Sequence, residues 1–366
     1  MMYLDNGATS FRKPPQVYRA VERAMKTCAN PGRGGYPGAM EASRVVYQCR
    51  ELAGELFDCQ PEQVIFTSNC THGLNIAIHA LVKPGTKVVI SGFEHNAVTR
   101  PLYQIGADIT VAGRKLFDWE NTVVSFEKAL KNGAEVAIFT HVSNVFGYIL
   151  PVEELAKLCK RYGAAFLIDA AQSAGSLPIS LKNLGAHYIA MPGHKGLLGP
   201  QGTGILLCAE DGEVFMAGGT GSNSASWKMP DFLPDKLEPG TLNVPGIAGL
   251  GAGIRHILRV GTNSIYTRER EAAKRCIQDL QDMGYRVFSG NHQGATVSFL
   301  PSQDCEVFAQ RLAGRGIAVR SGLHCAPLAH ESAGTLETGT VRLSFGLDAS
   351  PTQNAVFRQI ISQIHE

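Results

Sequence analysis

The chain has 366 residues, 44% of them apolar, which is enough to bury an ordinary core and to form one large domain beside a smaller one. Lys and Arg total 34 against 32 Asp and Glu, and the formal charge of +2 gives no electrostatic reason to expect a nucleic acid or an anionic membrane as partner. Polar residues follow the start of the chain at once and no segment reaches membrane-spanning length, so we expect a cytoplasmic protein with a small-molecule substrate.

Short apolar runs alternate with amphipathic stretches over residues 64–208, a pattern typical of βα units around a mostly parallel sheet. The expected strands cover 64–67, 87–91, 107–112, 136–140, 165–168, 188–191 and 204–208, with helices over 73–82, 123–131 and 152–162. From 217 to 245 the periodicity fails and Gly, Ser, Asn and Pro accumulate, which predicts a long ordered loop.

A second pattern follows this loop. It predicts helices over 247–260 and 265–283, short strands over 286–288, 296–299 and 341–344, and a last helix over 352–364. We therefore expect an α/β fold with a large domain over residues 15–250 and a smaller α+β domain formed by residues 1–14 and 251–366.

Polar residues gather where the expected strands end, and ligands of open parallel sheets bind beyond the carboxyl ends of the strands. The helix start after the first strand presents free N–H groups and the hydroxyl of Thr71, which suit a phosphate. Asp169 follows an apolar strand, where a buried carboxylate needs a cationic partner, and Lys195 follows the next strand. An amine that forms a Schiff base with an aldehyde, a carboxylate for a pyridine nitrogen and donors for a phosphate are the groups that pyridoxal 5′-phosphate requires.

Other glycine-containing segments do not match nucleotide-binding loops. The segment Gly193-His194-Lys195-Gly196 lacks the spacing of a P-loop, and the run at 249–253 neither fits G-x-G-x-x-G nor follows a strand. We expect that glycine run to allow close helix packing. Nine scattered cysteines without a CxxC pair favour neither a disulfide framework nor a metal site.

The ordered motifs resemble the class V, fold-type I family of pyridoxal-phosphate enzymes, and within it the cysteine desulfurases and selenocysteine lyases. The similarity spans nearly the whole chain and rests on YLDNGAT at 3–9, TSNCTHG at 67–73, EH at 94–95, HVSN at 141–144, DAAQS at 169–173, GHK at 193–195, EPGT at 238–241 and RSGLHCA at 320–326. The last motif is similar to the group II branch, in which both activities occur.

The resemblance implies roles for individual residues. Lys195, Cys325 and His95 would be catalytic, with His95 stacked on the cofactor ring. The carboxylate of the substrate would bind Arg342, assisted by Asn144 and Arg320, because a guanidinium offers two parallel donors. The implied cofactor-binding residues are Cys70, Thr71, His72, His95, Asn144, Asp169, Gln172, His194, Lys195 and Thr241. Thr241 would reach the phosphate of a neighbouring subunit, which implies a homodimer.

The choice among the possible activities depends on Cys325. It lies beside His324 and near Arg320, where positive charge is expected to favour a thiolate that takes sulfur from L-cysteine. The resemblance also implies a sulfur-acceptor protein and a role in iron–sulfur cluster assembly. A selenocysteine lyase acting on L-selenocysteine, a class V aminotransferase, another β-lyase and a non-catalytic sulfur carrier remain open. Two positions depart from the family: Pro192 replaces the usual Ser or Thr, and His72 replaces the usual Glu.

Overall fold

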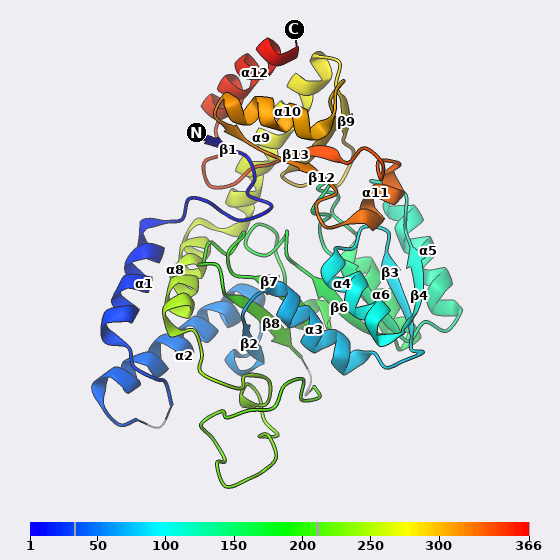
Figure 1. Cartoon of the computed structure of the whole chain (residues 1–366). Helices are drawn as coiled ribbons and strands as arrows, with labels where there is room; N and C mark the ends of the chain where they lie inside the picture. The colour runs from blue at the N-terminus through cyan, green and yellow to red at the C-terminus, as the bar shows by residue number, and fades with distance from the viewer. Residues whose placement is uncertain (33, 210–211, 366) are drawn as a thin grey trace.

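The computed structural model describes residues 1–32, 34–209 and 212–365, and Figure 1 shows a larger layered body below a smaller one. The larger body contains a seven-stranded sheet in the order β2-β8-β7-β6-β5-β3-β4. Among these strands, only β8 runs antiparallel to its neighbours, so the carboxyl ends of the other six lie at one edge. The strands are β2 Val64–Thr67, β3 Lys87–Ser91, β4 Asp108–Ala112, β5 Val136–Thr140, β6 Ala165–Asp169, β7 Tyr188–Pro192 and β8 Gly204–Cys208. The expected mostly parallel sheet is thus confirmed.

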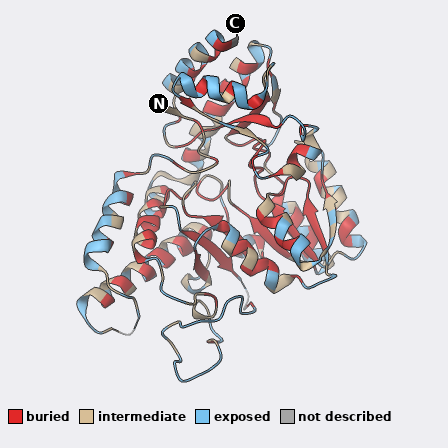
Figure 2. Cartoon of the chain, viewed as in Figure 1, coloured by how far each residue is buried: buried red, intermediate tan, exposed pale blue. Residues whose placement is uncertain are grey.

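Helices cover both faces of this sheet, which explains why β2, β5, β7 and β8 are buried at every position. Apolar side chains of α3 and α4 pack on one face, and those of α2, α5, α6 and α8 pack on the other. In Figure 2 the strands of this sheet are coloured mostly as buried, whereas the surrounding helices alternate between buried and exposed residues. The helices of this body are α1 Pro15–Thr27, α2 Pro37–Phe57, α3 Cys70–Leu81, α4 Asn96–Ile105, α5 Trp119–Lys131, α6 Val152–Tyr162, α7 Leu181–Leu184 and α8 Val244–Val260, with 3₁₀ turns η1 Pro61–Gln63 and η2 Asp235–Leu237.

The smaller body is built on a four-stranded antiparallel sheet in the order β12-β13-β10-β9, and it has its own apolar core. The N-terminal strand β1 pairs in parallel with β11, so both ends of the chain lie in this body (Figure 1). Its elements are β1 Met2–Tyr3, α9 Thr262–Asp282, β9 Arg286–Phe288, β10 Thr296–Leu300, α10 Cys305–Gly314, β11 Ile317–Ala318, β12 Arg320–Gly322, α11 Pro327–Ala333, β13 Thr340–Ser344 and α12 Pro351–His365.

The glycine run of α8 packs closely against its neighbours, as predicted. A Cβ atom on Gly249 would stand 2.7 Å from Val21 Cγ2 of α1. One on Gly253 would stand 2.3 Å from the carbonyl oxygen of Leu197, in the segment that follows Lys195. Glycine therefore lets α8 support the loop that carries this lysine. The predicted irregular segment before α8 is also present, and its only regular element among the described residues is η2.

Within the described parts of the chain, no helix is both long and apolar enough to span a membrane.

Candidate active site

The carboxyl edge of the large sheet brings together the predicted lysine and aspartate. Asp169 ends β6 and is 3% exposed, and its Oδ1 accepts a hydrogen bond from the Ala171 N–H at 2.8 Å. Burial raises the pKa of Asp169, although this hydrogen bond and the charge of Lys195 oppose the shift. Burial likewise lowers the pKa of Lys195, whereas the charge of Asp169 raises it. The site therefore holds an amine that loses its proton more readily than a surface lysine, next to a carboxyl that needs a cationic partner.

Cys70, at the start of α3, contacts the same carboxylate. Its Sγ lies 3.6 Å from Asp169 Oδ1, and burial raises the pKa of the Cys70 thiol well above its usual value. The thiol therefore stays protonated and donates to Asp169. The adjacent helix start is ordered by Asn69, whose side chain accepts the His72 N–H at 2.9 Å.

His95 caps α4 at the end of the segment after β3. Its Nδ1 accepts the Ala97 N–H at 3.0 Å, so the ring proton lies on Nε2. Burial, followed by the positive charges of Lys195 and Arg320, lowers the pKa of His95 to about 4. The imidazole is therefore neutral at physiological pH and presents an N–H donor.

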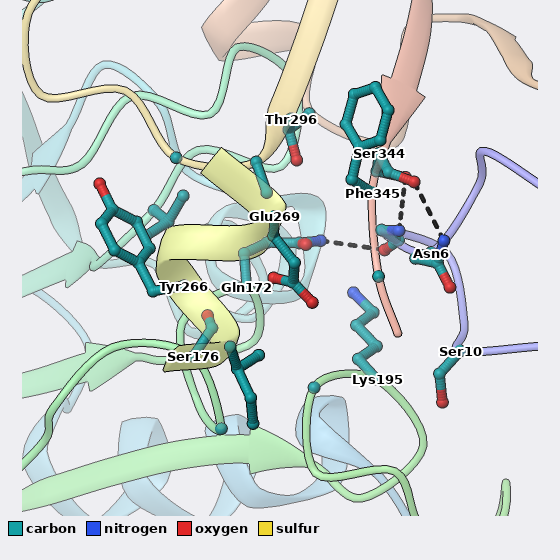
Figure 3. A pocket seen from close by; sticks show the side chains of 18 of the residues that line it. Asn6, Ser10, Gln172, Ser176, Lys195, Tyr266, Glu269, Thr296, Ser344 and Phe345 are labelled. Atoms are coloured by element: carbon teal, nitrogen blue, oxygen red, sulfur yellow. Dashed lines mark hydrogen bonds between the residues drawn. The ribbon is translucent and has the colours of Figure 1, made fainter. Parts of the chain in front are cut away.

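The N-terminal segment contributes a part of the site that the motif analysis did not assign to individual residues. Lys195 and Gln172 line a cavity together with Asn6 and Ser344 (Figure 3). Gln172 Nε2 donates to the Gly7 carbonyl oxygen at 3.0 Å, and Ser10 Oγ donates to the His194 carbonyl oxygen at 2.9 Å. The segment thus links the small body to the lysine loop.

His194 is held by the same segment. Its Nδ1 lies 3.0 Å from Thr9 Oγ1, and burial, followed by the charges of Lys195 and Lys13, lowers its pKa to about 4. Lys13 Nζ donates to Ser10 Oγ at 2.8 Å, and burial lowers the pKa of Lys13 to about 8. Sequence reasoning missed Lys13, since no periodic pattern or motif marks it.

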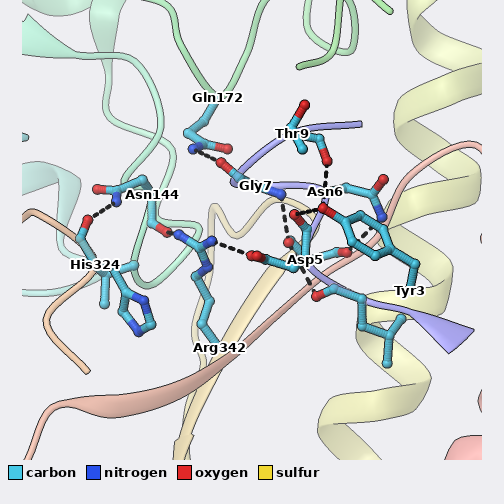
Figure 4. A network of polar contacts seen from close by, with 12 residues as sticks. Tyr3, Asp5, Asn6, Gly7, Thr9, Asn144, Gln172, His324 and Arg342 are labelled. Atoms are coloured by element: carbon cyan, nitrogen blue, oxygen red, sulfur yellow. Dashed lines mark hydrogen bonds and ion pairs between the residues drawn. The ribbon is translucent and has the colours of Figure 1, made fainter. Parts of the chain in front are cut away.

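Arg342, on β13, is 1% exposed and connects three segments of the chain (Figure 4). One of its terminal nitrogens forms an ion pair with Asp5 Oδ1 at 2.7 Å, and the other donates to the Asn144 carbonyl oxygen at 3.0 Å. Its Nε is buried without a partner among the described residues. The guanidinium therefore retains donor capacity for an anion. Sequence reasoning missed Asp5 as a partner, because 337 residues separate the two.

Cys325 lies in a turn between β12 and α11 and is exposed. The prediction that His324 carries a positive charge beside Cys325 is wrong. His324 is 4% exposed, its Nε2 lies 3.2 Å from the Thr340 carbonyl oxygen, and burial lowers the pKa of His324 to about 2. His324 is neutral because the turn directs the ring into the interior. Arg320 remains on the exposed side, on β12, paired in register with Arg342.

Three of the predicted cofactor-binding residues lie at the surface or contact only their own turn, and not the cavity that Lys195 lines. Thr71 is exposed at the first turn of α3. His72 Nδ1 accepts the Ser68 N–H at 3.3 Å, so its ring orders the turn that precedes the helix. Thr241 is also exposed and lines a surface pocket with Ser68 and His72, rather than the cavity with Lys195.

Comparisons with known proteins identify relatives of the whole chain. Residues 2–355 match the family model described as aminotransferase class-V. A probable cysteine desulfurase of Methanothermobacter thermautotrophicus is 33% identical, over 94% of this chain and 89% of its own length. One from Pyrococcus abyssi is 31% identical, over 100% and 94%. The apo structure of a cysteine desulfurase from Thermococcus onnurineus NA1 superimposes with a TM-score of 0.92 at 31% identity, covering 99% of this chain and 94% of that one.

Proposed function

We propose that this chain, which belongs to the class-V aminotransferase family and to its cysteine desulfurases, converts L-cysteine to L-alanine and leaves a persulfide on Cys325, with pyridoxal 5′-phosphate as cofactor. The observation that carries the proposal is that the buried carboxyl of Asp169 lies close enough to Lys195 for the two charges to interact, in a site that also holds an arginine with donor capacity and an exposed cysteine.

The residues present fit this cofactor. Lys195 would hold its aldehyde carbon, and Asp169 would face its ring nitrogen, which would supply the cation that the buried carboxylate needs. The N–H groups at the start of α3, with Thr71 and His194, would surround the phosphate. When bound, the cofactor withdraws electrons from the substrate Cα. Loss of the Asp169 carboxylate should therefore reduce the rate far more than it weakens binding.

The residues of the chain would orient the substrate and move its protons. Arg342 would bind the carboxylate through its remaining donors, and Asp5 would keep the guanidinium in place. Burial lowers the pKa of Lys195, so its amine can act as the base that removes the Cα proton. His95, neutral with its proton on Nε2, would donate a hydrogen bond within the site.

Sulfur transfer would take place at Cys325. Its thiolate would attack the substrate sulfur, forming an S–S bond while the Cβ–S bond breaks and its electron pair stays with carbon. Protonation of that carbon and return of a proton to Cα yield alanine, and the sulfur remains on Cys325 as a persulfide. Dividing the transfer in this way replaces one difficult step by two easier ones.

The test is to load purified protein with pyridoxal 5′-phosphate, incubate it separately with L-cysteine and L-selenocysteine, and measure alanine together with sulfide or selenide. A persulfide on Cys325, identified by alkylation and mass spectrometry, is expected after cysteine turnover. Cys325→Ala should abolish desulfuration, and Lys195→Ala should abolish both activities and the visible absorbance of the bound cofactor. Sulfide release with pyruvate in place of alanine, and without a persulfide, would refute the proposal in favour of a β-lyase that works by elimination, and formation of the keto acid of cysteine would favour an aminotransferase.

The same assay separates cysteine from selenocysteine as substrate. Selenium leaves carbon more readily than sulfur, so selenocysteine cleavage can survive Cys325→Ala. A wild-type protein that releases selenide but forms neither sulfide nor persulfide would instead be a selenocysteine lyase.

Several broader features also belong to the proposal. We propose a cytoplasmic homodimer in which Thr241, exposed in each subunit, reaches the cofactor phosphate of the other. A sulfur-acceptor protein would take the persulfide, and iron–sulfur cluster assembly is the process we propose it serves. The division into a large domain, 15–250, and a small domain, 1–14 with 251–366, is proposed on the same basis. The separate apolar core of the smaller body supports two domains, although the boundary at 250 falls within α8, whose Ile254 and Ile257 pack in the core of the larger body.

A further inference from the structure

Asn144 connects two parts of the candidate site through different atoms. Its carbonyl oxygen accepts from Arg342 at 3.0 Å, and its side-chain Nδ2 donates to the carbonyl oxygen of His324 at 2.8 Å (Figure 4). Asn144 itself is 9% exposed and follows β5. One buried residue thus contacts both the arginine expected to bind the substrate carboxylate and the turn that carries the nucleophile.

The turn needs such an anchor. His324 and Cys325 have φ angles of +51° and +57°, a left-handed conformation that residues with a Cβ atom adopt only at an energetic cost. The exposed side chain of Cys325 is not packed in a core that would hold it. Besides the packing of the buried His324 ring, three bonds to the rest of the chain hold the conformation: Asn144 to His324, the Asn96 N–H to the Cys325 carbonyl oxygen at 2.8 Å, and the His324 ring to Thr340.

We propose that Asn144 is a positioning residue that holds Cys325 at a fixed place relative to Arg342, in addition to any contact it makes with the cofactor. This inference rests on the proposed function, because it concerns the thiol that would take the sulfur. Asn144 bonds both to Arg342, which would hold the substrate carboxylate, and to the turn that carries Cys325, so it fixes the position of the turn relative to the bound substrate. Loss of the side-chain bond should leave the main-chain bond from Arg342 to Asn144 in place and increase the mobility of the thiol.

The test separates steps that need the thiol from steps that do not. Exchange of the Cα proton of L-alanine in D₂O requires Lys195 and Arg342 but no sulfur chemistry, whereas persulfide formation from L-cysteine also requires Cys325. Loss of one hydrogen bond of ordinary strength corresponds to a change in rate of about tenfold. In Asn144→Ala any lost contact with the cofactor or the substrate carboxylate lowers both rates alike, so we expect the ratio of persulfide formation to alanine proton exchange to fall by about that factor.

A second readout needs no turnover. Hydrogen exchange of the backbone over residues 323–326, followed by mass spectrometry in the cofactor-loaded protein, should be faster in Asn144→Ala than in the wild type. The matched control is Asn354→Ala, which removes a buried bond of the same kind, from Nδ2 to the Ala272 carbonyl oxygen at 2.7 Å, in the small body. That variant should leave exchange over 323–326 and both rates unchanged.

Equal losses of persulfide formation and alanine proton exchange would overturn the inference, because Asn144 would then act through the cofactor alone. Unchanged hydrogen exchange over 323–326 would overturn it as well. Failure of the proposed function gives a different result: the wild type itself would form no persulfide, whereas the hydrogen-exchange comparison would still decide whether Asn144 holds the turn.

Discussion

Glu94 is buried close enough to Asp169 for the two carboxyls to interact, and it should make the stability of the protein fall as pH rises. Its side chain is fully buried at the end of β3; Oε1 accepts from Ser91 Oγ and from the Thr140 N–H, the latter at 2.8 Å. Oε2 has no partner among the described residues. Burial raises the pKa of Glu94 from 4.5 to about 8, because the two hydrogen bonds only partly offset the loss of hydration. The carboxyl should therefore be protonated in the folded protein at neutral pH.

The magnitude follows from proton linkage. A carboxyl whose folded pKa is raised contributes stability at low pH that is lost as pH rises from about 4.5 to about 8, since only the unfolded chain gives up the proton freely. Each pH unit in that window costs about 1.4 kcal/mol. Between pH 5 and pH 7.5 the contribution of Glu94 to the free energy of unfolding should thus fall by about 3 kcal/mol.

Glu94→Gln removes the titration while preserving the acceptor for Ser91 and Thr140. Urea unfolding of cofactor-free protein at pH 5 and at pH 7.5, followed by circular dichroism, should show the variant gaining about 3 kcal/mol relative to the wild type at the higher pH. Glu120→Gln, at an exposed position in the first turn of α5, is the control and should follow the wild type at both pH values. A Glu94→Gln difference that is the same at both pH values would show that Glu94 is ionised in the folded state and refute the reasoning.

Two further predictions concern the supports of the site. Gly253→Ala would place its Cβ 2.3 Å from the Leu197 carbonyl oxygen, so it should cost about 1–3 kcal/mol of stability, measured by thermal unfolding, and lower cofactor occupancy, measured by absorbance. The control Gly251→Ala, whose Cβ would stand 3.3 Å from Cys49 Cβ, should have milder effects. Equal losses in the two variants would contradict the packing argument. Arg50→Ala removes the ion-pair partner of buried Glu238 and should lower the free energy of unfolding, measured in urea, by about 3–5 kcal/mol. The control Arg44→Ala, at an exposed ion pair, should lower it by about 1 kcal/mol or less. Similar losses in the two variants would show that Glu238 does not depend on Arg50.

The sequence predicted the sheet well because strands buried on both faces appear as continuous apolar runs. Helices with a strong apolar stripe, such as α6, were also predicted, here with the observed bounds. α1 and α2 were not predicted. α1 buries only Val17 and Ala24, and α2 buries many small residues, among them Ala39, Ala42 and Gly54. Contacts made by small residues give little apolar periodicity, so the sequence signal of α2 is weak. The reason does not hold for α1, whose Val17, Val21 and Ala24 recur at helical spacing and indicate a helix.

For the candidate site, the sequence located the strand ends that carry Asp169 and Lys195, because the topology of a parallel sheet brings those ends together. It could not show that Asp5 pairs with Arg342, since that contact joins opposite ends of the chain. Nor could it show that His324 is neutral: the direction of the ring depends on the left-handed turn, which the residue types do not predict.

Four of the hydrogen bonds around the candidate site share one chemical property. Gln172, Ser10, Arg342 and Asn144 each donate from a side chain, and each of these four bonds ends on a main-chain oxygen, of Gly7, His194, Asn144 and His324 respectively. A peptide oxygen persists whichever side chain its residue carries. Substitution of an acceptor residue therefore leaves its bond available, and mutagenesis reveals these links only from the donor side. Diverging homologues can likewise carry other residues at the acceptor positions and keep these hydrogen bonds.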